Sequence, residues 1–166
     1  MTERMVILGI DPGLASTGFG AITFNSSTSP SLLKCGCIRT SPGLHISDRL
    51  AQIYNDMEHL IASINPELVA IENIFSLVRY PKAGILLGGV LGIIYLSVFQ
   101  NNIRMVEITP KEVKSSLAGY GNASKKQIKE ATQKVLKISE LLSFHSADAL
   151  AIALTAYYRK SFQGDK

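Results

Sequence analysis

The chain has 166 residues, of which 46% are hydrophobic and 18% are charged. This composition is typical of a folded domain with a substantial core, and it excludes an intrinsically disordered or low-complexity protein. The formal net charge of +4 is too small to identify a partner by itself, so the position of the charges along the chain matters more.

Apolar periodicity predicts ten elements in the order β-β-β-α-β-α-β-α-α-α. The predicted strands cover residues 5–10, 18–24, 32–40, 68–71 and 104–108. The predicted helices cover residues 46–64, 83–99 and 144–158, and two more begin after Thr109 and Ser124, each of which opens a capping box. Ser47 is the expected N-cap of the first helix, and residues 25–31 are expected to form a hairpin loop.

Short connections between the first three strands predict an antiparallel meander, and the later alternation of helices with strands predicts parallel strands added to it. We therefore expect the α/β class, with a mixed five-stranded sheet flanked by helices. Neither a repeat nor a linker divides the sequence. Residues 1–160 are accordingly expected to form a single domain, and residues 161–166 a polar tail.

The helix at residues 83–99 stands out because its seventeen residues include no charge. The run is slightly shorter than a membrane-spanning helix needs and contains four glycines. We therefore expect no membrane association and a helix that is buried on most sides. Gly84, Gly88 and Gly92 recur every four residues and form a smooth stripe, which permits close packing against the sheet or a partner helix.

The two cysteines, Cys35 and Cys37, are two residues apart in a predicted strand. Their side chains would lie on one face, where a disulfide between them would be strained. We expect reduced thiols, as in a cytosolic protein. The polar residues 1–4 and the short apolar run after them do not resemble a signal peptide, so a cytoplasmic location is expected.

Three carboxylates interrupt or end strongly apolar segments. Asp11 follows the first strand within Gly-Ile-Asp-Pro-Gly, Glu72 ends the apolar run at residues 68–71, and Asp148 interrupts an alanine-rich helix. Because unpaired charge is costly to bury, the set indicates bound cations. For Asp11 alone, a turn carboxylate that bonds its own backbone is an equally good interpretation. His145 precedes Asp148 by three residues and shares its helix face.

If these side chains converge, they can hold two divalent cations through oxygen ligands. Two ions about 3.5–4 Å apart would activate a water molecule and stabilise the leaving oxygen in phosphoryl chemistry. Residues 111–137 hold seven Lys against two Glu, a net charge of +5, whereas the other residues hold ten basic and eleven acidic side chains. A solvated helix face would also explain these lysines. An acidic centre beside a basic flank fits a nucleic-acid substrate.

A set of motifs follows the same order through the chain: GIDPG at 9–13, TGFG at 17–20, GCIRT at 36–40, IENIF at 71–75, TPKEVK at 109–114, GYGNA at 119–123 and HSADALAIA at 145–153. Each motif alone is common, whereas the ordered set is specific. Together the motifs resemble the RuvC family of Holliday-junction resolvases, which has a ribonuclease H-like fold. The resemblance covers nearly the whole chain, from about residue 5 to residue 158.

The resemblance implies an endonuclease that resolves four-way junctions by paired, symmetric hydrolysis of phosphodiester bonds during homologous recombination and DNA repair. It implies that Asp11, Glu72, His145 and Asp148 form the catalytic, metal-binding set, since family members carry Asp or His at the position of His145. Two Mg²⁺ ions per active site are the implied cofactor, and the imidazole suggests that Mn²⁺ also supports activity. The implied partners are four-way junction DNA, a second copy in a two-fold dimer and a branch-migration motor.

Further residues match family positions that contact DNA. Lys114 and Lys125 match lysines that bind phosphate near the active site. Phe75 matches a residue that stacks on unpaired junction bases, although core packing would also explain it. Lys126 is an expected phosphate contact without a family counterpart. Residues 77–92 depart from the family because the usual Gln and Arg are absent, so DNA contacts from this region are expected to differ.

Two other functions fit parts of the sequence. The Asp-Pro-Gly turn before Ser16 and Thr17 resembles the phosphate hairpin of actin-like or sugar-kinase-like ATPases. Those proteins enclose nucleotide between two domains, however, and this chain is long enough for one. The altered residues 77–92 also fit a dimeric scaffold that binds junctions without cleaving them. Retention of the three carboxylates favours the enzyme, because buried acids without a metal would be a liability.

Overall fold

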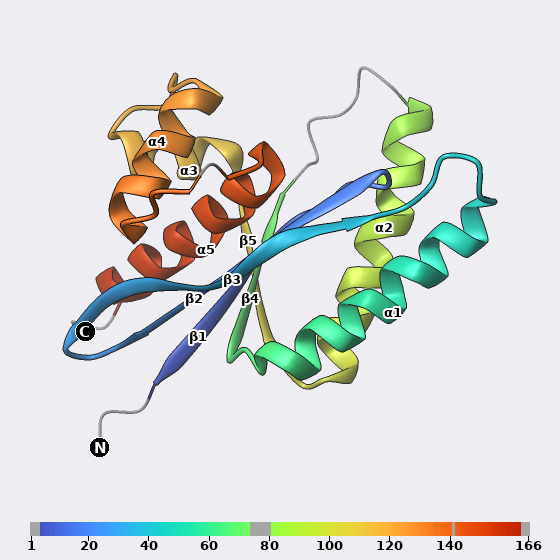
Figure 1. The fold of residues 1–166 in the computed structure, drawn as a ribbon, viewed down its shortest axis with the longest axis horizontal. Coiled ribbons are helices and arrows are strands. Elements are labelled where there is room, and N and C mark those ends of the chain that lie inside the picture. The colour runs from blue at the N-terminus through green and yellow to red at the C-terminus, as the bar shows by residue number, and fades with distance from the viewer. Residues whose placement is uncertain (1–3, 74–80, 141, 164–166) are drawn as a thin grey trace.

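The computed structural model describes residues 4–73, 81–140 and 142–163, and the ten predicted elements occur in the predicted order (Figure 1). The strands are β1 (Met5–Asp11), β2 (Ser16–Asn25), β3 (Thr28–Arg39), β4 (Leu68–Glu72) and β5 (Arg104–Ile108). The helices are α1 (Ile46–Ile64), α2 (Pro81–Gln100), α3 (Pro110–Ala118), α4 (Lys125–Leu136) and α5 (Phe144–Gln163).

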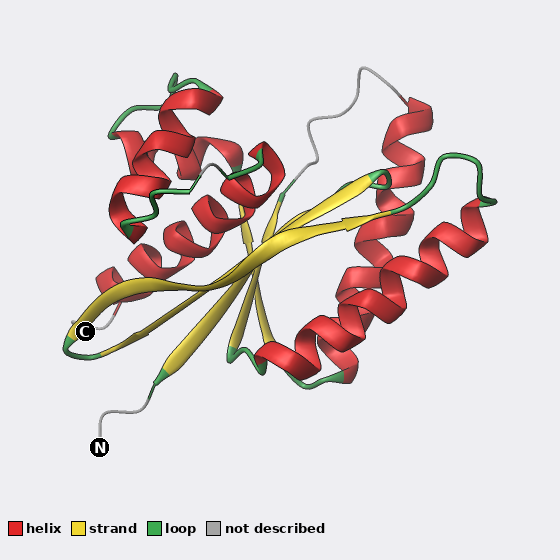
Figure 2. Ribbon diagram, in the orientation of Figure 1, coloured by secondary structure: helices red, strands yellow, loops and turns green. Residues whose placement is uncertain are grey.

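The five strands form one twisted sheet between two groups of helices (Figure 2). Their order across the sheet is β3-β2-β1-β4-β5. Strand β2 runs antiparallel to β1 and β3, whereas β4 is parallel to β1 and β5 is parallel to β4. The predicted α/β class and mixed five-stranded sheet are therefore confirmed.

The central strands send alternate side chains into two cores, one on each face of the sheet. Helices α3, α4 and α5 cover one face, and α1 and α2 cover the other (Figure 1). In β1, Ile7 packs in the core beneath α5, whereas Leu8 and Ile10 pack in the core beneath α1 and α2. By this alternation Gly9 and Asp11 share the α5 face with Ile7.

Glycines in β1 and β2 allow α5 to lie very close to the sheet. A Cβ atom added at Gly9 would lie 2.0 Å from a carbonyl oxygen of α5, and one at Gly18 would lie 2.3 Å from another. Gly20 pairs with Gly9 across the two strands, and a Cβ there would lie 2.6 Å from the Leu150 side chain. A larger residue at Gly9 or Gly18 would have to displace the helix backbone.

The hairpin between β2 and β3 is tighter than the sequence predicts. Instead of a loop over residues 25–31, the chain turns at residues 26–27, and β3 includes Pro30. The Ser27 N–H donates to Oδ1 of Asn25 at 2.9 Å within this turn. The loop prediction was wrong because β3 is an edge strand, where a proline without an N–H is tolerated.

The structure confirms two of the three N-caps that the sequence predicts. Both predicted capping boxes, at Thr109 and Ser124, are present. The predicted cap of α1 was wrong, because the N-cap is His45 rather than Ser47. The imidazole Nδ1 of His45 accepts the N–H of Ser47 at 3.3 Å and also lies 2.8 Å from the Ser47 hydroxyl. The ring nitrogen thus performs the role that hydroxyl or carboxylate oxygens usually perform.

Helix α2 is less buried than predicted. Of its 20 residues, only Val90, Ile94, Ser97 and Val98 are buried. This side packs against α1 and β5. The expectation of a helix buried on most sides was wrong, because an apolar composition does not specify what covers each side of a helix.

The other side of α2 carries an exposed stripe, which we call the α2 stripe and which consists of Ile85, Gly88, Gly92, Leu96 and Phe99. Ile85 and Phe99 are 76% and 78% exposed. A Cβ added at Gly88 or Gly92 would meet no atom within 4 Å. Among the described residues, α2 is the one helix long and apolar enough to cross a membrane, and 22% of its most apolar window is buried. Core helices of soluble proteins share this length and composition.

We predict that Gly9→Ala lowers the free energy of unfolding by about 1–3 kcal/mol, because the added methyl group must push α5 away from the sheet. Gly43→Ala is the matched control, since its added methyl group meets only an ordinary contact at 3.8 Å. The control should stay within about 0.5 kcal/mol of wild type. Urea unfolding followed by circular dichroism measures both, and equal stabilities for the two variants would contradict the role given to Gly9.

Candidate active site

Asp11 and Glu72 lie next to one another at the carboxyl ends of two parallel strands. In the register of β1 and β4, Ile10 is opposite Ile71, so the next residue of each strand reaches the same edge of the sheet. Both side chains point toward α5, because Ala70 of β4, like Ile7 of β1, belongs to the core on that face. Carboxyl ends of parallel strands are a common location of sites in α/β proteins.

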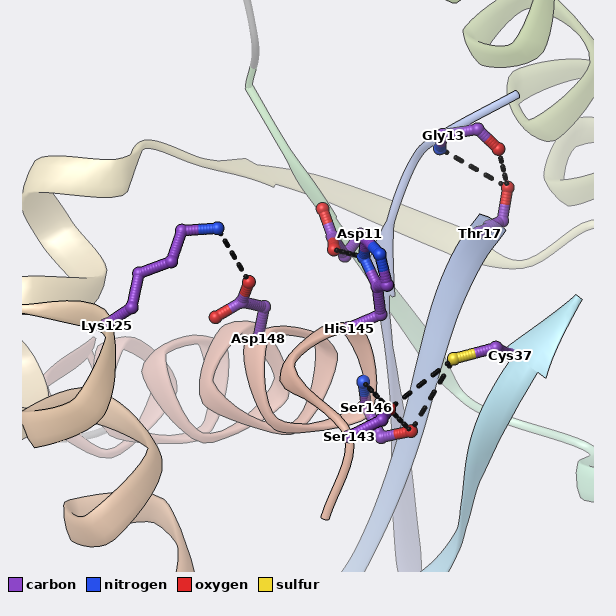
Figure 3. Close-up of polar contacts among 9 residues, drawn as sticks. All are labelled: Asp11, Gly13, Thr17, Cys37, Lys125, Ser143, His145, Ser146 and Asp148. Atoms are coloured by element: carbon purple, nitrogen blue, oxygen red, sulfur yellow. Dashed lines mark hydrogen bonds and ion pairs between the residues drawn. The ribbon is translucent and has the colours of Figure 1, made fainter. Parts of the chain in front are cut away.

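Helix α5 brings His145 and Asp148 to this edge. Residues 149–154 are buried, which fixes the helix on the sheet. His145 and Asp148 are one turn apart, and Figure 3 shows both on the side of α5 nearest Asp11. Nδ1 of His145 lies 3.1 Å from Oδ2 of Asp11. The four residues that the sequence singled out therefore gather in one region.

Asp148 also has a cationic neighbour from α4. Nζ of Lys125 lies 3.4 Å from Oδ2 of Asp148 (Figure 3). The Lys125 side chain is 77% exposed, so solvent screens the attraction and the pair contributes little to stability. The main effect of the pair is electrostatic, because it places an exposed positive charge beside a half-buried carboxylate.

Burial and mutual repulsion raise the pKa of two carboxyl groups. Loss of hydration, then repulsion from Asp11 and a hydrogen bond with it, raises the pKa of Glu72 to about 7. Burial also raises the pKa of Asp148, and the charge of Lys125 partly opposes that effect. A raised pKa means that the protein alone stabilises the ionised carboxylate poorly. The cluster therefore favours a bound cation.

The donor set fits a hard divalent cation, because it consists of carboxylate oxygens and one imidazole. Among the residues that the structure describes, no three His, Cys, Asp or Glu side chains already stand at metal-ligand spacing. Asp11 is paired with His145 and Asp148 with Lys125 instead. Coordination of a metal ion therefore requires these side chains to exchange partners.

The carboxylates open into a pocket of about 410 Å³. Asp11, Glu72 and Asp148 lie on one side of its lining, and α3 and α4 supply Lys114 and Lys125. The other lining residues are Pro110, Val113, Ala123, Ser124, Ile128 and Ile152. One cavity thus combines acidic groups that can hold cations with lysines that can contact a phosphate backbone.

One of the predicted DNA-contact lysines, Lys126, does not line this pocket. Lys126 follows Lys125 but points to solvent, with its Nζ 3.8 Å from Oε1 of Glu130 and a side chain that is 81% exposed. Phe75 lies outside the described residues. Of the three predicted lysines, the structure places Lys114 and Lys125 beside the carboxylates.

Sequence reasoning missed other contributors to the site. Pro110 and Ser124 were recognised only as signals of helix starts, yet both line the pocket. A helix-start signal shows where a helix begins but not which cavity that end faces. The cysteines are free, as expected. The contact of Cys37 Sγ with the hydroxyl of Ser143, at 3.6 Å, joins β3 to the start of α5 and has no local sequence signal.

Comparison with protein families and curated relatives gives a consistent result. The family model for crossover junction endodeoxyribonuclease RuvC matches residues 7–156. A RuvC of Caldicellulosiruptor saccharolyticus is 39% identical over 151 residues, which cover 90% of both chains. A RuvC of Natranaerobius thermophilus is 34% identical over 151 residues, which cover 90% of this chain and 92% of the relative.

Solved structures agree with the sequence comparison. The Thermus thermophilus RuvC structure is 31% identical, with a TM-score of 0.85 over 95% of this chain and 97% of that chain. The T. thermophilus RuvC in complex with a Holliday junction substrate gives a TM-score of 0.88 at 31% identity, over 95% of this chain and 96% of that chain. These matches confirm the ribonuclease H-like fold. The chain belongs to the RuvC family of crossover junction endodeoxyribonucleases.

Proposed function

We propose that this protein resolves four-way DNA junctions by paired, symmetric hydrolysis of phosphodiester bonds, in homologous recombination and DNA repair. The observation that carries the proposal is the single pocket that holds Asp11, Glu72 and Asp148 together with Lys114 and Lys125. The T. thermophilus relative binds a Holliday junction substrate, which supports the same substrate here. A match to a nuclease family over residues 7–156 gives no support to the ATPase alternative.

Asp11, Glu72, Asp148 and His145 are the residues that would hold the divalent metal on which the family depends. We propose two Mg²⁺ ions, with Mn²⁺ as an effective substitute because one ligand is an imidazole. When bound, such ions activate water and stabilise the leaving oxygen. The chain's own part is to aim the carboxylates at one point, and the raised pKa of Glu72 makes the ionisation of that group sensitive to pH near neutrality.

The lysines of α3 and α4 are proposed to bind the DNA backbone. Lys114 and Lys125 would hold the phosphates beside the scissile bond, since both line the pocket. Lys126, which points to solvent, would contact a more distant phosphate. Phe75 is proposed to stack on unpaired junction bases. Residues 1–160 are proposed to form the single nuclease domain, acting in the cytoplasm.

We propose further that two copies associate through the α2 stripe. A continuous apolar face with two open glycines allows a second helix to approach closely. A two-fold dimer also fits the substrate, because a four-way junction has pseudo-two-fold symmetry and paired nicks need two sites. A branch-migration motor is the proposed partner of the dimer on DNA.

We predict that the wild-type protein nicks a synthetic mobile four-way junction symmetrically in Mg²⁺ or Mn²⁺ and leaves a linear duplex of the same sequence intact. Asp148→Asn preserves size but removes the charge, so cleavage should fall by about 10²–10³-fold while junction binding in Ca²⁺ persists. Denaturing gels and mobility shifts measure the two properties. Binding without cleavage by both proteins would instead support the scaffold function.

We predict that Glu72→Gln abolishes cleavage but stabilises the metal-free protein at high pH. Folding raises the pKa of Glu72 from 4.5, the value of an unperturbed glutamate, to about 7. Its favourable contribution to folding is therefore complete below pH 4.5 and is lost as the pH rises to 7. In EDTA, the substitution should raise the free energy of unfolding by about 1–3 kcal/mol at pH 8 and by much less at pH 5. A gain of equal size at both pH values would contradict this account.

We predict that Gly92→Glu converts a dimer into a monomer without unfolding it. In the monomer the new side chain extends into open space, whereas in a helix–helix contact it would bury a charge. Ala62→Glu, at an exposed position of α1, introduces the same charge as a control and should remain dimeric. Sedimentation velocity distinguishes the species, and a monomeric wild-type protein in solution would refute the proposed contact.

A further inference from the structure

On the face of the sheet opposite the carboxylates, Glu107 joins two elements that are distant in sequence. Val106 and Ile108 of β5 pack on the α5 face, so Glu107 points to the α2 face. Its Oε2 accepts a hydrogen bond from Nδ2 of Asn73 at 2.9 Å, and its Oε1 accepts one from the hydroxyl of Tyr95 at 2.6 Å. One carboxylate thus connects the residue after β4 with the middle of α2.

Asn73 is anchored through both its backbone and its side chain. It directly follows Glu72, and its N–H donates to the carbonyl oxygen of Ile108 at 2.8 Å, which extends the contact between β4 and β5 by one residue. The side-chain bond to Glu107, also in β5, holds the same residue a second time. Because the residue after Glu72 is held twice, the backbone of Glu72 has little freedom and its carboxylate stays directed at Asp11.

The bond from Tyr95 to Glu107 is a strong one. Burial, then the hydrogen bond to Glu107 and the charge of that carboxylate, raises the pKa of Tyr95 to about 12. The phenol therefore remains a donor near neutral pH. Hydrogen bonds to an ionised acceptor are roughly twice as strong as neutral ones. Two such bonds in series, from Tyr95 and Asn73, tie α2 to the strand end that carries Glu72.

We propose that Glu107 is a positioning residue for Glu72 and links α2 to the active site. The inference rests on the proposed role of Glu72 as a metal ligand. Groups that orient a metal ligand from behind typically change metal affinity or activity by about 10–100-fold when they are removed.

Two substitutions test the link, and two others serve as matched controls. Glu107→Gln and Tyr95→Phe each remove one hydrogen bond of the network. Glu58→Gln and Tyr54→Phe make the same chemical changes in bonds that join α1 to the end of α2, where Asn101 donates to Glu58 at 3.1 Å and Tyr54 donates to Gln100 at 3.0 Å. These control bonds do not involve β4 or β5.

Binding of Mn²⁺, followed by electron paramagnetic resonance, is the main measurement, beside cleavage kinetics and urea unfolding. For Glu107→Gln we expect Mn²⁺ affinity and kcat each to fall about tenfold, with KM for the junction within about twofold of wild type. Tyr95→Phe should act in the same direction with a smaller effect. Both control variants should keep wild-type Mn²⁺ affinity and kcat.

A rescue variant separates positioning from general loss of structure. Asn73→Asp combined with Glu107→Gln exchanges donor and acceptor, since the new amide can donate to the new carboxylate while still accepting from Tyr95. The double variant should recover most of the Mn²⁺ affinity that Glu107→Gln alone loses. Recovery of affinity by an exchange of partners is not expected from a residue that only supports the fold.

Unchanged Mn²⁺ affinity and kcat in Glu107→Gln would overturn the inference, whatever happens to its stability, because a purely structural bond changes only the free energy of unfolding. Equal losses in Glu58→Gln would overturn it as well. A wild-type protein that binds Mn²⁺ but does not cleave a junction would overturn the proposed function instead. The Mn²⁺ affinities of the variants would still decide whether Glu107 positions Glu72.

Discussion

Backbone contact between α5 and the glycines of β1 and β2 brings the two halves of the candidate active site together. Asp11 comes from a strand and Asp148 from a helix more than a hundred residues later, and they share a pocket because α5 lies directly on Gly9 and Gly18. Any side chain at these positions would lift the helix, and its acidic residue with it. Helices α3 and α4, which carry the lysines, also pack against α5.

The same closeness makes the site electrostatically unfavourable without a cation. Glu72 is raised in pKa by burial and by Asp11, and Asp148 is raised mainly by burial. Two neighbouring side chains offset part of the repulsion: the imidazole of His145 bonds to Asp11, and the ammonium group of Lys125 pairs with Asp148. Carboxylates whose charge the protein compensates only in part gain free energy when a divalent cation binds beside them. The repulsion among these acids thus lowers the free energy of unfolding when no cation is bound.

Sequence patterns predicted the order of all ten elements and the four residues that gather at the strand ends. They succeeded because apolar runs, capping boxes and acidic interruptions are local signals. They failed where the structure depends on contacts with other elements. Pro30 was predicted to lie in a loop because the sequence does not show that its strand is at the edge of the sheet. Helix α2 was predicted to be buried because the sequence does not show which of its sides is covered. The bonds of Glu107 were not foreseen, because the register of β4 against β5 determines which residues meet. The metal-binding and DNA-contact roles of all these residues, including Phe75 and Lys126, stay predictions.

The edge position of Pro30 has a consequence for how copies of this chain behave when crowded. An edge strand exposes unpaired N–H and C=O groups that can recruit another strand and start an intermolecular sheet. Strand β3 is 12 residues long and lies at the border of the sheet, so it would be a ready template for such growth. Within this strand Pro30 lacks an N–H, and the register of β3 against β2 shifts at two places. Both features make the strand less regular, and irregular edge strands are one means by which natural proteins limit pairing with other chains.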